Sequence, residues 1–128
     1  MPKNTILWAD DDYDDLQMMQ EILDKKNNDF KIVEVHNGKG ALSFLQQSPD
    51  LPCLIILDIN MPVLDGKETL SILKTTERYK HIPVVMFTTS QSELDKLYCS
   101  RFHTEMVTKP PTYYSLSAAL DKLLNFCK

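Results

Sequence analysis

Short apolar segments alternate with longer amphipathic segments along the whole chain. We expect the short segments to form five strands, at residues 5–9, 30–35, 54–57, 84–88 and 106–108. Residues 54–57 and 84–87 are apolar at every position, which is typical of parallel strands that are covered on both faces. The longer segments carry apolar residues at helical spacing, as Leu16, Met19 and Leu23 do. Strict alternation of strands and helices predicts an α/β fold with a parallel sheet, five helices and right-handed crossovers.

Capping residues and helix breakers place the ends of several helices. Asn37 precedes a short helix that ends near Ser48, and Ser90 or Ser92 is expected to cap a helix that begins at Glu93. A final helix is expected over residues 115–126. The chain has 128 residues and shows no repeat, linker or low-complexity tract, so we expect one domain over residues 1–128.

Polar side chains follow most of the predicted strands. Three acids, Asp10 to Asp12, follow the first strand, Asp58 follows the third, Thr88 ends the fourth, and Lys109 follows the fifth. In parallel α/β sheets, ligands bind beyond the carboxyl ends of the strands, near the point where the strand order reverses. We therefore expect carboxylates, a hydroxyl and an ammonium group to converge on one small volume.

The acids at this edge predict a metal site. Two carboxylates about 4 Å apart repel by roughly 4 kcal/mol at an effective dielectric constant near 20, and a divalent cation removes that cost. An all-oxygen ligand set points to Mg²⁺ rather than to a soft metal. We assign Asp10, Asp11 and Asp58 to this site and interpret Asp14 and Asp15, like Asp12, as solvated helix-capping acids.

A calcium-binding EF-hand is excluded because the sequence lacks two features that this motif requires. Asp10, Asp12, Asp14 and Glu21 match the ligand spacing of that loop. However, its invariant glycine would fall on Asp15, and a strand rather than a helix precedes the acids.

Composition and charge exclude other classes of protein. The formal net charge is −4, which argues against a nucleic-acid partner. No apolar run is long enough for a membrane span, and the first residues lack a secretory hydrophobic segment, so we expect a cytoplasmic protein. Cys53, Cys99 and Cys127 are odd in number and widely spaced, which favours a reducing compartment over a disulfide framework. We expect all three cysteines to be inert, and the three histidines to lie apart in surface or satisfied positions.

Four motifs in register resemble the receiver domain of two-component response regulators. They are residues 6–12 (ILWADDD), residues 57–62 (LDINMP) with Asp65 and Gly66, residues 83–88 (PVVMFT), and residues 107–110 (VTKP). Asp10–Asp12 and residues 87–90 further resemble the chemotaxis-type, single-domain members. The resemblance implies a flavodoxin-like, doubly wound sheet with strand order 2-1-3-4-5.

The resemblance also implies a metal site and a phosphoacceptor. Asp58 would accept the phosphoryl group, with Mg²⁺ as the cofactor. Asp11 would bind Mg²⁺ directly, Asp10 would bind it through water, and the backbone carbonyl of Asn60 would complete the protein ligands. A carboxylate is a competent nucleophile toward phosphorus, so this role agrees with the chemistry of the residues themselves.

Two more residues would act on the phosphoryl group. Thr88 would donate its hydroxyl to the group and Lys109 would form an ion pair with it, which supplies the positioning and charge neutralisation that phosphoryl transfer needs. The bond between Lys109 and Pro110 is usually cis in this family, which would aim the lysine inward. The expected partners are a histidine kinase or histidine phosphotransfer protein, an unidentified downstream protein, and a second copy of the chain after phosphorylation.

Several positions depart from the family pattern. Met106 stands where the family usually has a tyrosine or phenylalanine, and Thr89 where a small residue is common. Phe102 and His103 replace the usual Gly-Ala pair before the fifth strand, and Pro111 replaces an apolar residue. We therefore expect phosphorylation to be read out through the loop at residues 88–93 more than through Met106.

Three other functions compete with a phosphorylated signalling domain. A Mg²⁺-dependent aspartyl phosphohydrolase would need a second acid at Asn60 and a covering cap. A flavodoxin-like electron carrier would need a phosphate-cradling loop where this chain has an acidic run. A phosphorylation-independent scaffold would have no use for the acids, Thr88 and Lys109 together. We therefore expect a signalling protein rather than a turnover enzyme.

Overall fold

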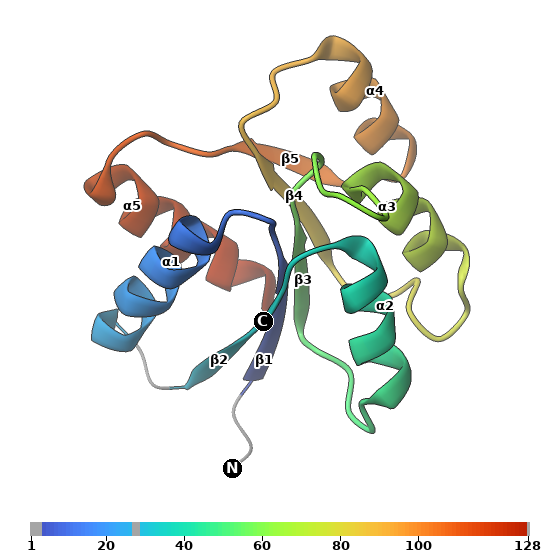
Figure 1. Cartoon of the computed structure of the whole chain (residues 1–128), viewed down its shortest axis with the longest axis horizontal. Coiled ribbons are helices and arrows are strands. Elements are labelled where there is room, and N and C mark those ends of the chain that lie inside the picture. The colour runs from blue at the N-terminus through green and yellow to red at the C-terminus, as the bar shows by residue number, and fades with distance from the viewer. Residues whose placement is uncertain (1–3, 27–28, 128) are drawn as a thin grey trace.

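The computed structural model describes residues 4–26 and 29–127 and shows strands and helices in strict alternation (Figure 1). The strands are β1 (Asn4–Ala9), β2 (Phe30–Val35), β3 (Leu54–Leu57), β4 (Val84–Thr88) and β5 (Glu105–Thr108). The helices are α1 (Tyr13–Lys26), α2 (Gly38–Gln47), α3 (Gly66–Thr75), α4 (Glu93–Arg101) and α5 (Tyr113–Leu124), followed by a 3₁₀ turn at Asn125–Cys127. The expected α/β class is confirmed.

The strands form one parallel sheet in the order β2-β1-β3-β4-β5. Helices α1 and α5 cover one face, and α2, α3 and α4 cover the other (Figure 1). The doubly wound, flavodoxin-like topology is therefore confirmed. Strand order reverses between β1 and β3, so the carboxyl ends of these two strands flank the crevice in which ligands of such sheets bind.

Burial on both faces explains the uninterrupted apolar strands. Every residue of β3 and β4 is buried, and successive side chains enter opposite cores. Trp8 belongs to the core under α1 and α5, and its ring meets that of Phe87 edge-on at 5.8 Å between centroids. The central strands are thus fixed from both sides, and their polar ends are held in a defined arrangement.

Helix α4 ends without the glycine that usually stops a helix. His103 takes the left-handed conformation instead, with φ 54°. The backbone N–H of Thr104 donates to the Cys99 carbonyl and that of His103 to the Ser100 carbonyl, each at 3.0 Å, which is the Schellman pattern of helix ends. At the other end, Ser92 rather than Ser90 is the cap, because its side chain accepts from the N–H of Asp95.

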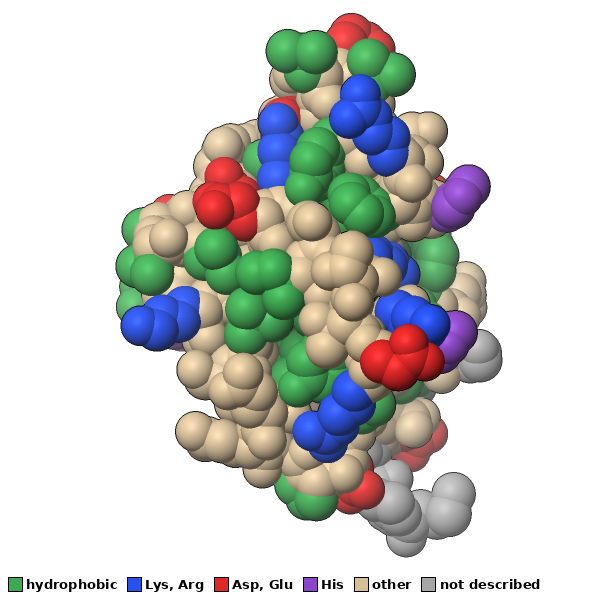
Figure 2. All heavy atoms as spheres, turned by 90° about the vertical axis from the view of Figure 1, so that its right-hand side faces the viewer, with side chains coloured by type: hydrophobic (Ala, Val, Ile, Leu, Met, Phe, Trp, Pro, Cys, Tyr) green, Lys and Arg blue, Asp and Glu red, His purple; other side chains and the backbone are tan. Residues whose placement is uncertain are grey.

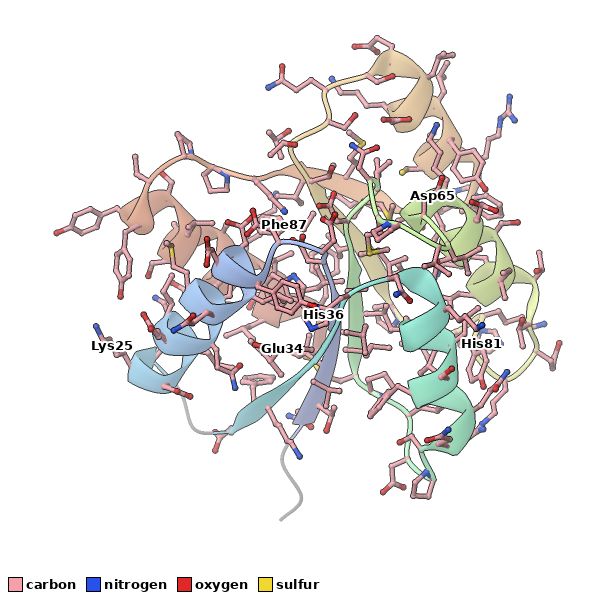
Figure 3. All side chains as sticks on the ribbon, in the orientation of Figure 1. Lys25, Glu34, His36, Asp65, His81 and Phe87 are labelled. Carbon is pink, nitrogen blue, oxygen red and sulfur yellow. A yellow bond between two sulfur atoms is a disulfide. The ribbon has the colours of Figure 1, made fainter. Side chains whose placement is uncertain are left out.

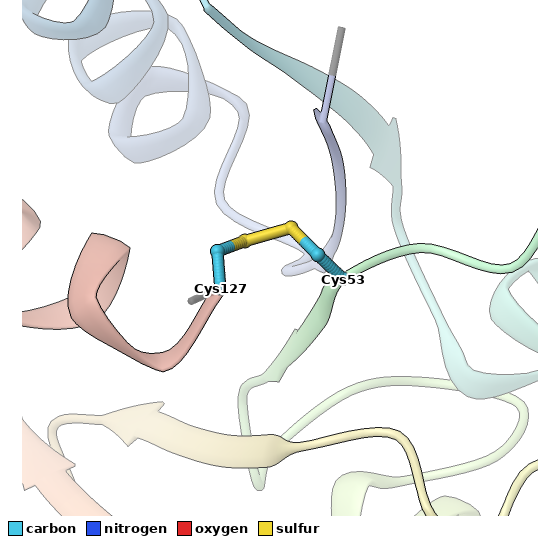
Figure 4. Close-up of a disulfide and its surroundings, with 2 residues drawn as sticks. All are labelled: Cys53 and Cys127. Atoms are coloured by element: carbon cyan, nitrogen blue, oxygen red, sulfur yellow. A yellow bond between two sulfur atoms is a disulfide. The ribbon is translucent and has the colours of Figure 1, made fainter. Parts of the chain in front are cut away.

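The expectation of inert, unpaired cysteines is wrong for two of the three. Cys53 and Cys127 form a disulfide with a Cα–Cα distance of 4.9 Å, whereas Cys99 is free and buried (Figure 4). Cys53 immediately precedes β3, and the 3₁₀ turn after α5 returns to the same end of the sheet. The pair is separated by 74 residues, so its proximity arises from the chain path and not from any local spacing.

The expected cis bond before Pro110 is also absent. All peptide bonds in the described parts of the chain are trans. The backbone of Lys109 is fixed at the end of β5, because its N–H donates to the Thr88 carbonyl at 2.8 Å. Its side chain reaches the acidic edge of the sheet without a cis bond.

Candidate functional site

Asp10 and Asp58 lie side by side because of the strand register. Ala9 of β1 pairs with Leu57 of β3, and the backbone N–H of Asp58 donates to the Ala9 carbonyl at 3.0 Å. The next residue of each strand therefore leaves the sheet at the same place. Both side chains are buried, at 1% exposure for Asp10 and 8% for Asp58.

Asp11 completes an acidic triad with these two residues. Asp11 is exposed, and one carboxylate oxygen from each of the three aspartates lies within 4.8 Å of the others. The sequence prediction that Asp10, Asp11 and Asp58 converge is confirmed by this geometry. A shallow, open hollow at the surface is lined by residues 11–14 and so includes Asp11 of the triad.

Lys109 reaches across the edge of the sheet into the acidic cluster. Its ammonium lies 2.6 Å from Asp10 Oδ2, 3.1 Å from Asp58 Oδ2 and 3.0 Å from Asp15 Oδ2. Burial alone would lower the pKa of this lysine, but the hydrogen bond and charge of Asp10, with the charge of Asp58, raise it above its ordinary value. The ammonium group is therefore a permanent positive charge of the site.

For Asp10, in contrast to Lys109, the surroundings favour the neutral form of the side chain. Burial raises its pKa to about 6, although hydrogen bonds from Lys109 and from the N–H of Asp12 lower it. The nearby charge of Asp58 adds to the rise. The ionised form of Asp10 is thus disfavoured chiefly by burial, and the repulsion from Asp58 that the sequence predicts makes a smaller contribution.

The structure supplies an independent test of whether a metal fits. Asp58 Oδ1 is buried and has no hydrogen-bond partner within the described residues, while its other oxygen contacts Lys109. A buried carboxylate oxygen without a partner is costly, and a bound cation would satisfy it. The triad offers only oxygen ligands, as hard divalent cations such as Mg²⁺ prefer. The residues present therefore fit the predicted metal.

The loop that follows Asp58 is held rigidly. A side chain at Gly66 would place its Cβ only 2.1 Å from the Asp58 carbonyl oxygen, so glycine is required at this close approach. The Gly66 N–H donates to the Ile59 carbonyl, and Asp65 caps α3 by accepting from the N–H of Glu68 at 2.9 Å (Figure 3). Asn60 lies in this loop and is exposed. The role of its carbonyl in metal binding stays a prediction.

Thr88 lies at the end of β4, fully buried. Its hydroxyl accepts a hydrogen bond from the Ser90 N–H at 3.2 Å, which places it at the start of the loop to α4. Met106 of β5 is half-buried, pairs with Met86 in the sheet, and packs against the core under α2, α3 and α4.

The expectation that all the acids of the first turn of α1 are solvated caps is wrong for Asp15. Asp12 is a helix cap as expected, because its Oδ1 accepts from the N–H groups of Asp14 and Asp15 at 3.1 Å each. Asp15 was expected to be a solvated acid as well, but it is a direct partner of Lys109. Its position in the first turn of α1 could be read from the sequence, but the direction of a lysine from the far end of the chain could not.

His36 is a satisfied residue, as expected. Its Nδ1 lies 3.2 Å from the Asp10 carbonyl oxygen, within reach of an Nδ1–H donor, and its ring stacks on Tyr13 with centroids 3.9 Å apart. Figure 3 shows it between the end of β2 and the first turn of α1. It supports the loop that carries the acids.

Comparison with known proteins agrees with this geometry. Residues 6–121 match the family model for the response regulator receiver domain. Response regulator Rcp1 of Synechocystis sp. (strain ATCC 27184 / PCC 6803 / Kazusa) is 36% identical over 107 residues, which cover 80% of this chain and 73% of Rcp1. Transcriptional regulatory protein CpxR of Escherichia coli (strain K12) is 36% identical over 94 residues, or 73% of this chain, but the match covers only 37% of that longer protein.

Solved structures show the same fold. The phosphorylated cyanobacterial phytochrome response regulator RcpA has a TM-score of 0.89 at 29% identity, with 97% of this chain and 93% of that chain covered. The Mn²⁺-bound form of Rcp1 has a TM-score of 0.86 at 32% identity, with 96% and 93% covered. The chain therefore belongs to the response regulator receiver domain family of two-component signalling.

Proposed function

We propose that this receiver domain accepts a phosphoryl group on Asp58 from a phosphohistidine, carried by a histidine kinase or a histidine phosphotransfer protein, and signals through altered protein contacts. Receiver domains as a class take phosphoryl groups from histidine kinases. The observation that supports Asp58 as the acceptor is its buried Oδ1, which has no partner in the described structure and lies beside the Asp10 and Asp11 carboxylates.

Asp10, Asp11 and Asp58 would hold Mg²⁺, with the Asn60 carbonyl as a further ligand. When bound, Mg²⁺ would neutralise charge on the triad and on the transferred phosphoryl group. Receiver domains bind Mg²⁺ or Mn²⁺ at such an acidic cluster, and the Mn²⁺-bound Rcp1 is an example among the structural relatives.

The transfer uses groups of this chain whose positions are described above. One Asp58 oxygen forms a bond to phosphorus while the bond between phosphorus and the donor imidazole nitrogen breaks. The electron pair of that bond stays on the nitrogen, which takes a proton from solvent. Lys109 Nζ, 3.1 Å from Asp58 Oδ2, is placed to pair with the phosphoryl oxygens, and the Thr88 hydroxyl donates to them from the end of β4.

We propose that residues 1–128 act as one receiver domain in the cytoplasm, as a signalling module and not as a turnover enzyme on a small substrate. No helix in the described ranges is long and apolar enough to cross a membrane. The Cys53–Cys127 disulfide favours an oxidising compartment instead, since disulfides are rare in the cytosol.

Phosphorylation by acetyl phosphate with Mg²⁺ tests the acceptor. We expect the intact mass to increase by one phosphoryl group in the wild type and in Asp50→Asn, an exposed acid used as a matched control. Asp58→Asn should take up none. Stoichiometric uptake by Asp58→Asn would refute the assignment, and continuous release of phosphate from small esters would favour a phosphohydrolase instead.

Thermal unfolding tests the metal. Millimolar Mg²⁺ should raise the melting temperature of the wild type, because it binds the folded state and relieves repulsion within the triad. The increase should be lost in Asp11→Asn and kept in Asp50→Asn. Trp8, two residues before Asp10, gives a fluorescence signal for the same titration. Equal responses in Asp11→Asn and the wild type would exclude the proposed ligand set.

A further inference from the structure

The Lys109 ammonium has three carboxylate partners, and they are not equivalent. Asp10 and Asp58 belong to the acidic triad, whereas Asp15 comes from the first turn of α1 and lies outside it. A lysine ammonium offers three N–H donors, so the three carboxylates can engage all of them. The Lys109 ammonium is thus held by three carboxylates, and its side chain is only 8% exposed.

The proposed reaction removes two of these partners. A cation held by the triad would compete with the ammonium for the carboxylates of Asp10 and Asp58. Transfer of a phosphoryl group to Asp58 then converts its carboxylate to an acyl phosphate, so that the acyl oxygens no longer carry a charge. Of the three carboxylates that contact Lys109, Asp15 alone is altered by neither event.

Asp15 is also well placed to remain in position. Its backbone N–H is bound by the Asp12 side chain, which caps α1, so the turn that carries it is fixed. The Asp15 side chain is 37% exposed, against 1% for Asp10, so its charge remains hydrated and carries little desolvation cost. Lysine is a point charge on a flexible stem of four carbons, and such a group needs an anchor to be oriented.

We propose that Asp15 is a positioning residue that anchors the Lys109 ammonium beside Asp58, so that the ammonium faces the incoming phosphoryl group once Asp10 and Asp58 are engaged. This inference rests on the proposed function of Asp58. Asp15 touches neither the phosphoryl group nor the triad and acts only through Lys109.

Asp15→Asn and Asp14→Asn form a matched pair of variants. Both acids lie in the first turn of α1, and both variants remove one negative charge near the site and one favourable interaction with the helix N-terminus. Asp14 is exposed and is not a partner of Lys109. Any difference between the variants therefore reports the contact with Lys109 and not the general charge of the site.

The first measurement is the rate of phosphorylation at fixed acetyl phosphate and saturating Mg²⁺. We expect Asp15→Asn to be slower by about tenfold, the effect of losing one charge-assisted hydrogen bond that orients a transition-state group. Asp14→Asn should stay within about twofold, and Asp15→Glu, which keeps the carboxylate, should recover most of the rate. Circular dichroism and melting curves check that each variant is folded.

The second measurement needs neither metal nor phosphoryl group. The buried, fully bonded Lys109 ammonium should give a slowly exchanging ¹⁵N–¹H resonance in the metal-free wild type and in Asp14→Asn. We expect the resonance to broaden or disappear in Asp15→Asn. If Asp15→Asn matches Asp14→Asn in either measurement, Asp15 is not the anchor.

Failure of the proposed function has a different signature. In that case the wild type itself takes up no phosphoryl group at Asp58, and all variants behave alike in the kinetic measurement. A phosphorylated wild type with equal rates in Asp14→Asn and Asp15→Asn would instead overturn the positioning role alone.

Discussion

The hydroxyl of Thr88 accepts a hydrogen bond from the backbone N–H of Ser90, and this contact connects the end of β4 to helix α4. The Ser90 hydroxyl donates to Asp95 Oδ2 in the first turn of α4, and Asp95 Oδ1 forms an ion pair with Lys67 of α3. The hydrogen bonds from Lys67 and Ser90 hold the pKa of Asp95 below its ordinary value. A movement of Thr88 toward a phosphoryl group would therefore disturb contacts that join two helices.

The exposed surface of α4 lies next to these contacts and would change with them. Leu94 and Leu97 of α4 are 73% and 59% exposed, next to Lys67 and Tyr98 in a shallow groove. Figure 2 shows this side of the molecule, where apolar side chains lie in patches between lysine and arginine residues. A shift of α4 would change which apolar atoms this surface offers.

We predict that Thr88, and not Met106, transmits the phosphorylated state to α4. Methionine is flexible and fills irregular gaps, so it lacks two distinct positions between which to switch. Thr88→Ala should abolish most of the chemical shift changes that beryllofluoride causes in α4, and Ser90→Ala should reduce those at Asp95. Met106→Ala should leave them largely in place.

The exposed Ser100 of α4 provides the control, since Ser100→Ala removes a hydroxyl from the same helix without touching these contacts. The route through Ser90 is wrong if Met106→Ala removes the shift changes and Thr88→Ala preserves them.

Asp10 should make the stability of the metal-free protein depend on pH. Its pKa is raised to about 6 in the folded state from 3.8, so between these values the unfolded chain loses its proton first. The free energy of unfolding therefore falls as pH rises from about 4 to about 6, and the full cost, up to about 3 kcal/mol, is present above that range. Asp10→Asn should stabilise the protein at pH 7.5 and much less at pH 4.5.

Urea unfolding in the presence of a chelator measures this difference at the two pH values. Asp14→Asn, at an exposed position, should show no comparable gain at pH 7.5. A loss of stability in Asp10→Asn that is larger at pH 7.5 than at pH 4.5 would contradict the prediction.

The disulfide should contribute to stability chiefly through the unfolded chain. It closes a loop with a sequence separation of 74 residues, for which the loop-entropy model gives about 4.5 kcal/mol as an upper value. Reduction should lower the free energy of unfolding by up to this amount without changing the fold, because the cysteines lie at the end of the sheet away from Asp58. In Cys127→Ser a reductant should have no effect on unfolding, and a large effect there would point to another cause.

The left-handed residue at the end of α4 predicts a stabilising substitution. A side chain at φ 54° costs about 1 kcal/mol relative to glycine, so His103→Gly should raise the free energy of unfolding by about that amount. His81→Gly makes the same change at an exposed residue with an ordinary φ and should not stabilise the protein. Thermal unfolding of the two variants decides the matter, and equal effects would show that the conformation of His103 is not the cause.

The fold was predictable because its signals are local. Apolar runs at β3 and β4 report burial on both faces, and the alternation with helices restricts the connections to parallel crossovers. The caps of α2, at Asn37, and of α4, at Ser92, could be read from residue type alone, although Ser90 was an equal candidate. The helix end at His103 was harder, because no glycine marks it.

The sequence by itself determined that Asp10, Asp11, Asp58 and Lys109 meet, since they end strands of one parallel sheet, and register brings the ends of such strands together. Only the tertiary structure decided which further side chain joins this cluster and which cysteines form a disulfide. The contact of Asp15 with Lys109 and the disulfide between Cys53 and Cys127 each join segments far apart in the chain. Such pairs carry no periodic or motif signal, because their distances depend on the full path of the backbone and on side-chain direction.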